Sequence, residues 1–192
     1  APTTKLKRLL QSPFTLHTGI LGRIERETRI AAAGRPARII AKMNALNEPQ
    51  VVRALYAASQ AGVQIDLIIR GACILPAGLP GVTDHVRVRS VIGRLLEHSR
   101  VFYFRIDSVE SLWLSSADWM NRNMLRRVEL AWPVTDPALR QRVLDECLSA
   151  SLHDTKDAWL LQPDGSYLSA ADGASVRHSA QAALMARYGH KG

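Results

Sequence analysis

The chain has 192 residues, of which 47% are apolar, and this size and composition suit a single domain with a hydrophobic core. It contains no run of about 18 apolar residues, so the sequence predicts no membrane-spanning helix. The formal net charge of +8 favours a polyanionic partner, which could be nucleic acid, anionic lipid or a phosphate chain.

The first predicted element is a helix. Ser12 and Pro13 are typical of a helix start, with serine as the N-cap and proline at the first helical position. Gly34 predicts the end of this helix near Ala33, and Pro36 follows just beyond it.

The clearest architectural pattern follows directly. Residues 37–43 (ARIIAKM) form a short β-branched run, and residues 63–70 (VQIDLIIR) form a nearly continuous apolar run. Between them, Asn47 and Gln50 predict the start of a helix, which Gly62 ends. Strand, helix and strand within about thirty residues make a βαβ unit, so we expect two parallel, buried strands.

The rest of the chain predicts more strands and two more helices. Strands are expected at residues 86–91, 101–106, 112–115 and 127–132, a helical turn at 94–98, and helices beginning at Asp136 and at Ser175. The sequence therefore predicts an α/β domain with a mixed sheet, one parallel βαβ unit and flanking helices. We divide this single domain into an N-terminal helix over residues 1–35, an α/β core over 36–160 and a helical tail over 161–192.

The first of these two helices is expected to pack Leu139, Val143 and Cys147 or Leu148 inward. Cys147 and Cys73 lie far apart and lack the spacing of a metal site. They are typical of buried thiols in a reducing compartment. We expect residence in the cytoplasm because residues 1–8 contain no apolar signal-peptide core, and the basic charge leaves peripheral association with the inner membrane surface open.

The segment 97–100 (EHSR) leads into an apolar strand. Side chains alternate in extended chain, so His98 and Arg100 are predicted to point to the same side. An imidazole beside a guanidinium suits a phosphoryl group, because one moves a proton while the other clamps oxygens. The competing interpretation is a histidine at a helix C-terminus, where the helix dipole favours it.

Three more polar features could line a cleft. Asp118 lies in the polar segment 115–123, which either lines a cleft or simply forms a turn. Arg127 and Glu129 are expected on one face of a strand, where Glu129 holds Arg127 for a phosphate unless that face is solvated. Arg70 ends the most apolar strand, and ligands of parallel sheets gather at such carboxyl ends.

No metal site is predicted. The remaining histidines show no metal-ligand spacing; they are His17, His85, His153, His178 and His190. The sequence also lacks GxxxxGK[ST], a GxGxxG after a strand, and GxSxG.

Five blocks of the chain, in order, resemble the polyphosphate kinase family of the bacterial, histidine-phosphorylating type. They are KMNAL at 42–46, AASQAGV at 57–63, DLIIRG at 66–71, EHSRV at 97–101 and SSADWM at 115–120. The resemblance covers most of residues 6–156 and implies a phospholipase D-like α/β domain, one of two similar domains side by side. It also implies reversible transfer of the γ-phosphate of ATP to inorganic polyphosphate through a phosphohistidine.

The resemblance implies a role for each candidate residue. Arg70 and His98 bind the nucleotide phosphates, and His98 also assists proton transfer. Arg100 and Arg127 are further phosphate-binding residues, and Asp118 and Glu129 support them.

One departure from the family is informative. Its phosphorylated histidine and magnesium-binding arginines lie in the preceding domain, in blocks that this chain lacks. The phospholipase D pattern, His-x-Lys followed by Asp, is also not met, because residues 100 and 105 are both arginine. We therefore expect half of an active site, which folds alone but turns over poorly.

The expected ligands and partners follow from the same resemblance. They are ATP or ADP, inorganic polyphosphate, Mg²⁺ held mainly by the upstream domain, the upstream domains of the same polypeptide, and further copies in a full-length homo-oligomer. Nucleic acid is not expected.

Two alternatives stay open. The first is a phospholipase D-like phosphodiesterase or nuclease, which would hydrolyse a diester without metal. The second is a non-catalytic polyanion-binding module, whose affinity would fall with salt and scarcely respond to changes at Arg70 or His98.

Overall fold

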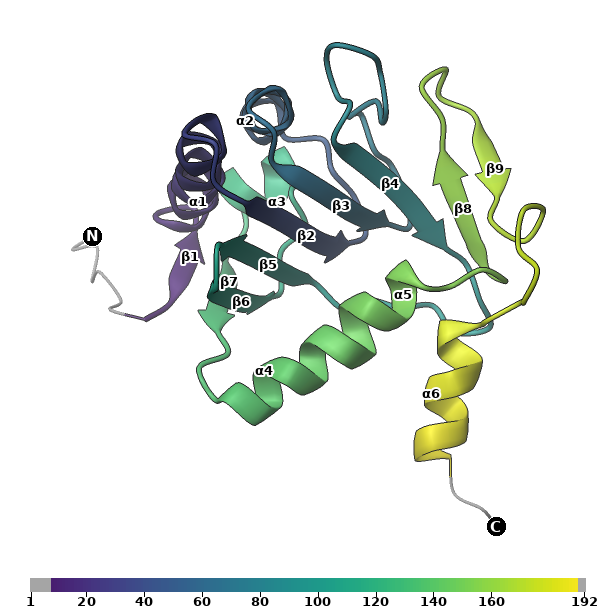
Figure 1. Ribbon diagram of the computed structural model, residues 1–192. Helices are drawn as coiled ribbons and strands as arrows, with labels where there is room; N and C mark the ends of the chain where they lie inside the picture. The colour runs from purple at the N-terminus through teal and green to yellow at the C-terminus, as the bar shows by residue number, and fades with distance from the viewer. Residues whose placement is uncertain (1–7, 190–192) are drawn as a thin grey trace.

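The computed structural model describes residues 8–189, and three parallel strands form the centre of its sheet (Figure 1). These strands are β2 (Ala37–Met43), β3 (Gln64–Ile69) and β4 (Val86–Val91). Helix α2 (Pro49–Gln60) connects β2 to β3, so the predicted βαβ unit is confirmed.

Antiparallel strands extend this centre on both sides. Within residues 8–189 the sheet has nine strands in the order β1-β7-β6-β5-β2-β3-β4-β8-β9. The added strands are β1 (Leu10–Ser12), β5 (Val101–Ile106), β6 (Val109–Ser115), β7 (Glu129–Pro133), β8 (Ala158–Leu161) and β9 (Tyr167–Ser169). The predicted mixed α/β sheet is therefore confirmed, including the β5–β6 hairpin.

Helices cover both faces of the sheet. Helix α1 (Leu16–Ala32) lies with α2 on one face (Figure 1). On the other face lie α4 (Pro137–Val143), a π-helical segment (Leu144–Ser149) and α5 (Ala150–Leu152). The short α3 (Asn121–Leu125) precedes β7, and α6 (Ala180–Tyr188) ends the described chain. No described helix is both long and apolar enough to cross a membrane.

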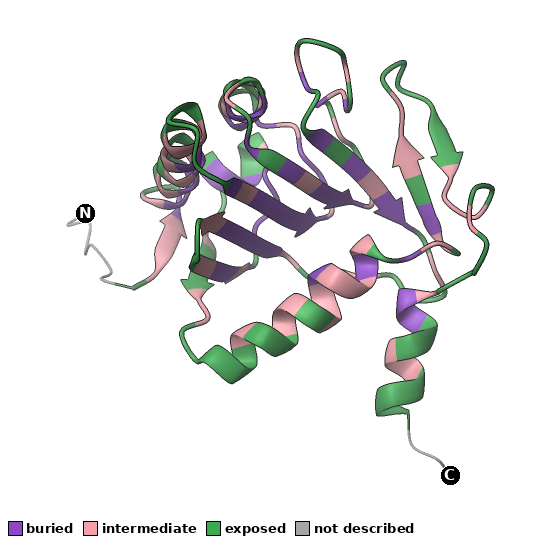
Figure 2. Cartoon of the chain, viewed as in Figure 1, coloured by how far each residue is buried: buried purple, intermediate pink, exposed green. Residues whose placement is uncertain are grey.

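Burial is concentrated on the central strands (Figure 2). The larger core lies between the sheet and α1–α2, where Ile20, Ile39 and Leu55 are fully buried. The smaller core lies on the other face and includes Ile40 and Leu148. Since both faces are covered, β2 reads as a nearly continuous apolar run in the sequence.

The predicted start of the first helix is wrong. Ser12 is the last residue of β1, where it pairs with Glu129, and the Ser12–Pro13 peptide is cis. Helix α1 begins at Leu16 with Thr15 as its N-cap. Its predicted end is close to the observed one, and Gly34 there has a φ of +76°, which favours glycine.

Helix α2 also has a different cap. Its N-cap is Glu48 rather than Asn47, and the Glu48 carboxylate accepts a hydrogen bond of 2.7 Å from the Val51 N–H. Pro49 then occupies the first turn, as is common. The Asn47 N–H donates instead to the carbonyl of Trp119 at 3.0 Å, which ties this loop to the polar segment after β6.

Other differences concern short elements. The predicted helical turn at 94–98 is not helical, and the last helix begins at Ala180 rather than Ser175. Leu139, predicted to pack inward, is 53% exposed. The sequence also does not predict α3, β1, β8 or β9, each of which has at most five residues.

Candidate functional site

The candidate site lies where the three parallel strands end. A small cleft there is lined by Lys42 near the end of β2, Asn44 just after it, Arg70 after β3, and Glu97 and Ser99 before β5. Strand β5 runs antiparallel to β2, so its start meets the carboxyl end of β2. The topology therefore collects polar side chains from distant parts of the chain at this edge.

A buried carboxylate organises one side of the cleft. Asp118 is 6% exposed and accepts hydrogen bonds from the Asn44 N–H at 2.7 Å and from Asn44 Nδ2 at 3.2 Å. The same carboxylate accepts from the guanidinium of Arg100, at 3.1 Å from Nε and 3.4 Å from the other nitrogen. Asp118 thus fixes both side chains, and its charge is balanced by Arg100.

Arg70 is held by a neutral group instead. Two of its guanidinium nitrogens donate to Asn44 Oδ1, at 3.3 Å and 2.8 Å. Within residues 8–189, Arg70 forms no ion pair with a carboxylate. Its charge is therefore available to an incoming anion, while Asn44 fixes its orientation.

His98 lies exposed next to this network. Its carbonyl accepts a 2.9 Å hydrogen bond from Arg100, which ties the backbone of His98 to the Asp118 network. No hydrogen bond to the imidazole occurs within the described part of the chain, so both ring nitrogens face solvent. The competing interpretation, a histidine at a helix C-terminus, is wrong because residues 94–98 are not helical.

A buried lysine of β2 fixes the loop before His98. Lys42 is 7% exposed and forms an ion pair with Glu97, and it also donates to Ser151 Oγ at 2.9 Å. Burial alone would raise the pKa of the Glu97 carboxyl, but the charge and hydrogen bond of Lys42 outweigh burial and lower that pKa. Glu97 is therefore ionised at neutral pH and serves as an anchor for the loop.

Helix α6 holds the same loop from the other side. Gln181 is 4% exposed, and its amide oxygen accepts from the Leu95 N–H at 2.7 Å. Its amide nitrogen donates to the Leu95 carbonyl at 2.8 Å and to Glu97 Oε1 at 2.9 Å. A single side chain thus satisfies three polar groups of the loop that leads to His98.

Arg127 and Glu129 do not interact as predicted. Arg127 precedes β7, and its N–H donates to the Arg122 carbonyl at 2.9 Å, which continues the turn of α3. The alternation expected of a strand therefore does not apply at Arg127. Glu129 accepts from Ser116 Oγ and, at 3.1 Å, from Asn123 Nδ2, so it holds the neighbouring turn instead. Arg127 itself is exposed.

Four of these residues were not predicted as part of the site. Asn44 had a usable signal, because it directly follows a buried strand at its carboxyl end. Lys42 had one as well, since it is the only charged residue in the second half of the strand 37–43. Glu97 had the signal of the block 97–101 that contains it, whereas Gln181 had none beyond the polarity of its side chain.

The donor set at this edge does not fit Mg²⁺. Among the described residues there is no group of three or more His, Cys, Asp or Glu side chains that could hold a metal ion. The two carboxylates nearest the cleft, Asp118 and Glu97, are each neutralised by a cation of the chain. Mg²⁺ requires free oxygen ligands, which these groups do not offer.

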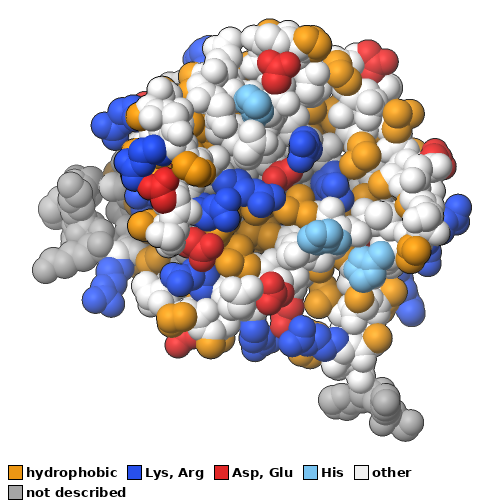
Figure 3. All heavy atoms as spheres, in the orientation of Figure 1, with side chains coloured by type: hydrophobic (Ala, Val, Ile, Leu, Met, Phe, Trp, Pro, Cys, Tyr) orange, Lys and Arg blue, Asp and Glu red, His pale blue; other side chains and the backbone are white. Residues whose placement is uncertain are grey.

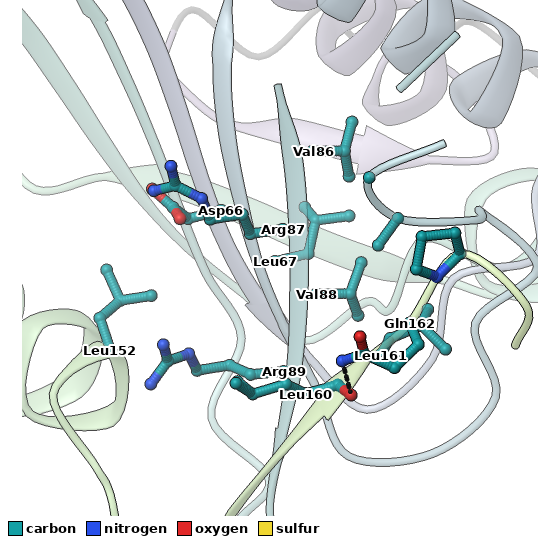
Figure 4. Close-up of a pocket in the computed structure, with 13 residues that line it drawn as sticks. Asp66, Leu67, Val86, Arg87, Val88, Arg89, Leu152, Leu160, Leu161 and Gln162 are labelled. Carbon is teal, nitrogen blue, oxygen red and sulfur yellow. Dashed lines mark hydrogen bonds between the residues drawn. The ribbon is translucent and has the colours of Figure 1, made fainter. Parts of the chain in front are cut away.

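A larger pocket lies away from this edge. Figure 4 shows a pocket of about 270 Å³ where β8 diverges from β4, lined by Asp66, Arg87, Arg89 and mostly apolar side chains. Arg89 donates from this pocket to the carbonyls of Ser151 and Asp154, at 3.2 Å and 3.3 Å. One guanidinium nitrogen of Arg89 is thus bound to backbone carbonyls of this chain, and most of the lining is apolar, so this pocket does not rival the cleft as a reactive site.

Comparison with known proteins gives a consistent result. The family described as "Polyphosphate kinase C-terminal domain 2" matches residues 9–181. The polyphosphate kinase of Xylella fastidiosa (strain Temecula1 / ATCC 700964) is 57% identical over 188 residues, which is 96% of this chain and 27% of that protein. The chain thus spans about a quarter of the length of the curated relatives it matches.

Solved structures agree with the fold. The crystal structure of polyphosphate kinase from Porphyromonas gingivalis is 36% identical with a TM-score of 0.90, covering 95% of this chain and 28% of that one. A phospholipase D family member, Nuc from Salmonella typhimurium, has a TM-score of 0.51 at 17% identity, covering 72% of this chain and 88% of that one. The predicted phospholipase D-like fold is confirmed, and the chain belongs to the polyphosphate kinase C-terminal domain 2 family.

Proposed function

We propose that this chain is the nucleotide-phosphate-binding half of a kinase that reversibly transfers the γ-phosphate of ATP to inorganic polyphosphate. The observation that carries the proposal is Arg70, which lies at the carboxyl end of β3, held by Asn44 and unpaired with any described carboxylate. Family membership and the names of the relatives support it.

Each side chain at the edge has a chemical task in this proposal. Arg70 and Arg100 bind phosphate oxygens through charge-assisted hydrogen bonds, and Asp118 keeps Arg100 in place. Arg127 adds a positive charge from the segment before β7. His98 supplies a ring nitrogen that donates a proton to a phosphate oxygen or accepts one from it.

The covalent step uses a histidine outside this chain. A histidine nitrogen of the upstream domain attacks the γ-phosphorus of ATP, and ADP leaves with the bridging oxygen. A terminal oxygen of polyphosphate then attacks the phosphohistidine, and the histidine nitrogen leaves with its electron pair. The cations at this edge stabilise the charge on the phosphate oxygens in both steps. No step is assigned to Mg²⁺, which we place on the upstream domain.

The chain is therefore half of an active site in this proposal. Its partners are the upstream domains of the same polypeptide and, in the full-length protein, further copies. We place the protein in the cytoplasm, with its basic surface able to approach the inner membrane. A phosphodiesterase or nuclease is less well supported, because Arg100 occupies the position of the lysine in that pattern and is bound to Asp118.

Labelling with ATP tests whether the phosphorylated histidine lies in the upstream domain and not in this chain. The chain is incubated with Mg²⁺ and γ-labelled ATP, and acid-labile phosphate bound to protein is counted. We expect no label, because the nucleophilic histidine lies upstream. Label that disappears in His98→Ala would show that His98 is itself the phosphorylated nucleophile, which contradicts the proposal.

ATP binding tests the role of Arg70 at the carboxyl ends of the parallel strands. ATP affinity is measured by calorimetry for the chain, for Arg70→Gln and for Arg53→Gln, which removes the same charge from the exposed side of α2. We expect Arg70→Gln to weaken ATP binding about tenfold or more and Arg53→Gln to change it little. Equal effects of the two variants would show a generic basic surface instead.

A further inference from the structure

A second group of arginines lies at the opposite end of the central strands. Arg38 at the start of β2, Arg87 at the start of β4 and Arg105 near the end of β5 line a pocket of about 440 Å³. Gln64 and Asp66 of β3 complete its charged and polar lining. Figure 3 shows Lys and Arg side chains grouped over the strands in the middle of this face, with an acidic side chain among them.

This pocket is separate from the candidate site. Arg38 and Asn44 lie six residues apart along extended chain, which corresponds to about 20 Å. A nucleotide bound at Arg70 would therefore leave the pocket free.

The pocket carries excess positive charge. Arg105 and Arg38 are directly opposed in the β5–β2 pairing, and Asp66 is opposed to Arg87 in the β3–β4 pairing. Asp66, the one carboxylate of the lining, forms an ion pair of 2.7 Å with Arg38. Three guanidinium groups and one carboxylate leave an excess of two positive charges. Like charges directly opposed on neighbouring strands destabilise a sheet unless an anion lies between them.

The same arginines have unused donors. The Nε atoms of Arg38 and Arg105 are buried and have no hydrogen-bond partner among the described residues. Within residues 8–189, Arg87 and Arg105 also form no ion pair. Figure 4 shows Arg87 and Asp66 projecting to the same side of β3 and β4. Buried donors without acceptors are unfavourable. The charges of Arg87 and Arg105, which no described carboxylate pairs, are available to an anion in the pocket.

We propose that this pocket binds a phosphate-type oxyanion and that its occupant is a segment of inorganic polyphosphate. The guanidinium fork matches phosphate oxygens, and three forks in one pocket suit a ligand with several neighbouring phosphates. The oxyanion site rests on the geometry alone, whereas the choice of polyphosphate rests on the proposed function. The pocket would retain the chain while its end reacts at the other edge of the sheet.

Tripolyphosphate is the first probe. Its affinity is measured by calorimetry in an Arg70→Gln background, which removes binding at the candidate site. We expect Arg87→Gln combined with Arg105→Gln to weaken binding about tenfold or more, and Arg53→Gln, on the other face, to have little effect. Asp66→Asn removes the only negative charge of the lining and should tighten binding. Circular dichroism checks that each variant is folded.

The outcomes separate this proposal from the proposed function. The pocket is not the binding site if the double variant binds tripolyphosphate with unchanged affinity. The same conclusion follows if Arg53→Gln loses as much affinity as the double variant. Tighter binding of long polyphosphate than of tripolyphosphate or orthophosphate supports a chain as the occupant, and equal affinities overturn that choice. ADP binding that survives Arg70→Gln contradicts the proposed function and leaves the pocket standing.

Discussion

Gln181 of α6 donates a 2.9 Å hydrogen bond to the carboxylate of Glu97, although 84 residues separate them in the chain. Glu97 also pairs with Lys42, the next-to-last residue of β2. The last helix, the loop before His98 and the central strand are thereby joined through three side chains. The position of His98 consequently depends on a helix that carries no candidate reactive residue of its own.

We expect Gln181→Ala to loosen this loop. The change leaves the N–H and carbonyl of Leu95 without partners, so stability should fall by about 1–3 kcal/mol. Limited proteolysis should become faster within residues 92–99, and ATP affinity should fall. Gln141→Ala is a matched control, because Gln141 makes one exposed hydrogen bond to Asp145. A loss of stability without faster cleavage in the loop would refute a positioning role.

Asp118→Asn tests whether a buried ion pair contributes more to stability than an exposed one. The variant keeps the shape of the side chain but removes the charge that binds Arg100, so we expect a loss of about 1–3 kcal/mol together with weaker ATP binding. Asp107→Asn is the control, since Asp107 pairs with Arg35 at the surface and should cost at most about 1 kcal/mol. Urea denaturation and calorimetry measure both effects. Equal destabilisation would show that burial of Asp118 is unimportant.

The Glu97 anchor should depend on pH. The folded chain lowers the pKa of Glu97 below its ordinary value of 4.5, so its stabilising effect is complete above 4.5 and is lost as the pH falls through the folded value. Glu97→Gln should therefore differ most from the unmodified chain at neutral pH. Urea denaturation at several pH values measures this difference. A difference that grows toward low pH would contradict the assignment.

Two leucines of the helical segment that begins with α4, Leu148 and Leu139, should contribute very differently to stability. Leu148 is 1% exposed, so Leu148→Ala should destabilise the chain by about 2–5 kcal/mol. Leu139 is 53% exposed, so Leu139→Ala should change stability by at most about 0.5 kcal/mol. Thermal and urea denaturation of both variants provide the comparison. Comparable losses would mean that α4 packs as its sequence pattern predicts.

The leucine pair also shows what could be predicted from sequence. Strands β2, β3 and β5 were predicted because apolar runs of six or seven residues distinguish buried strands from loops. Strand β4 was predicted with its observed bounds, β6 only over 112–115 of Val109–Ser115, and β7 at 127–132 instead of Glu129–Pro133. The inward face of the helix that begins at Asp136 was predicted in part, because Val143, Cys147 and Leu148 pack against the smaller core, whereas Leu139 is exposed. Strands β1, β8 and β9 are too short to produce a pattern.

The candidate site was predictable in part for a similar reason. Arg70 could be placed because a strand end is visible in the sequence, and His98 because its block resembles the family. The hydrogen bonds that position them could not, since Asn44 and Asp118 are 74 residues apart, as are many such partners. Contacts of this range depend on the topology of the sheet, which single-residue patterns do not encode.

The close approach of Gly93 to Gln181 limits how the chain can be shortened or altered. A Cβ atom at residue 93 would lie 2.5 Å from Gln181 Oε1, so any other residue there would displace the Gln181 amide from its hydrogen bonds to the loop. Removing the residues after Ser179 would also release this loop, because the side-chain amide of Gln181 that binds Leu95 would be lost. The smallest piece of this chain that keeps its reactive edge in order therefore extends into α6, well past the last strand.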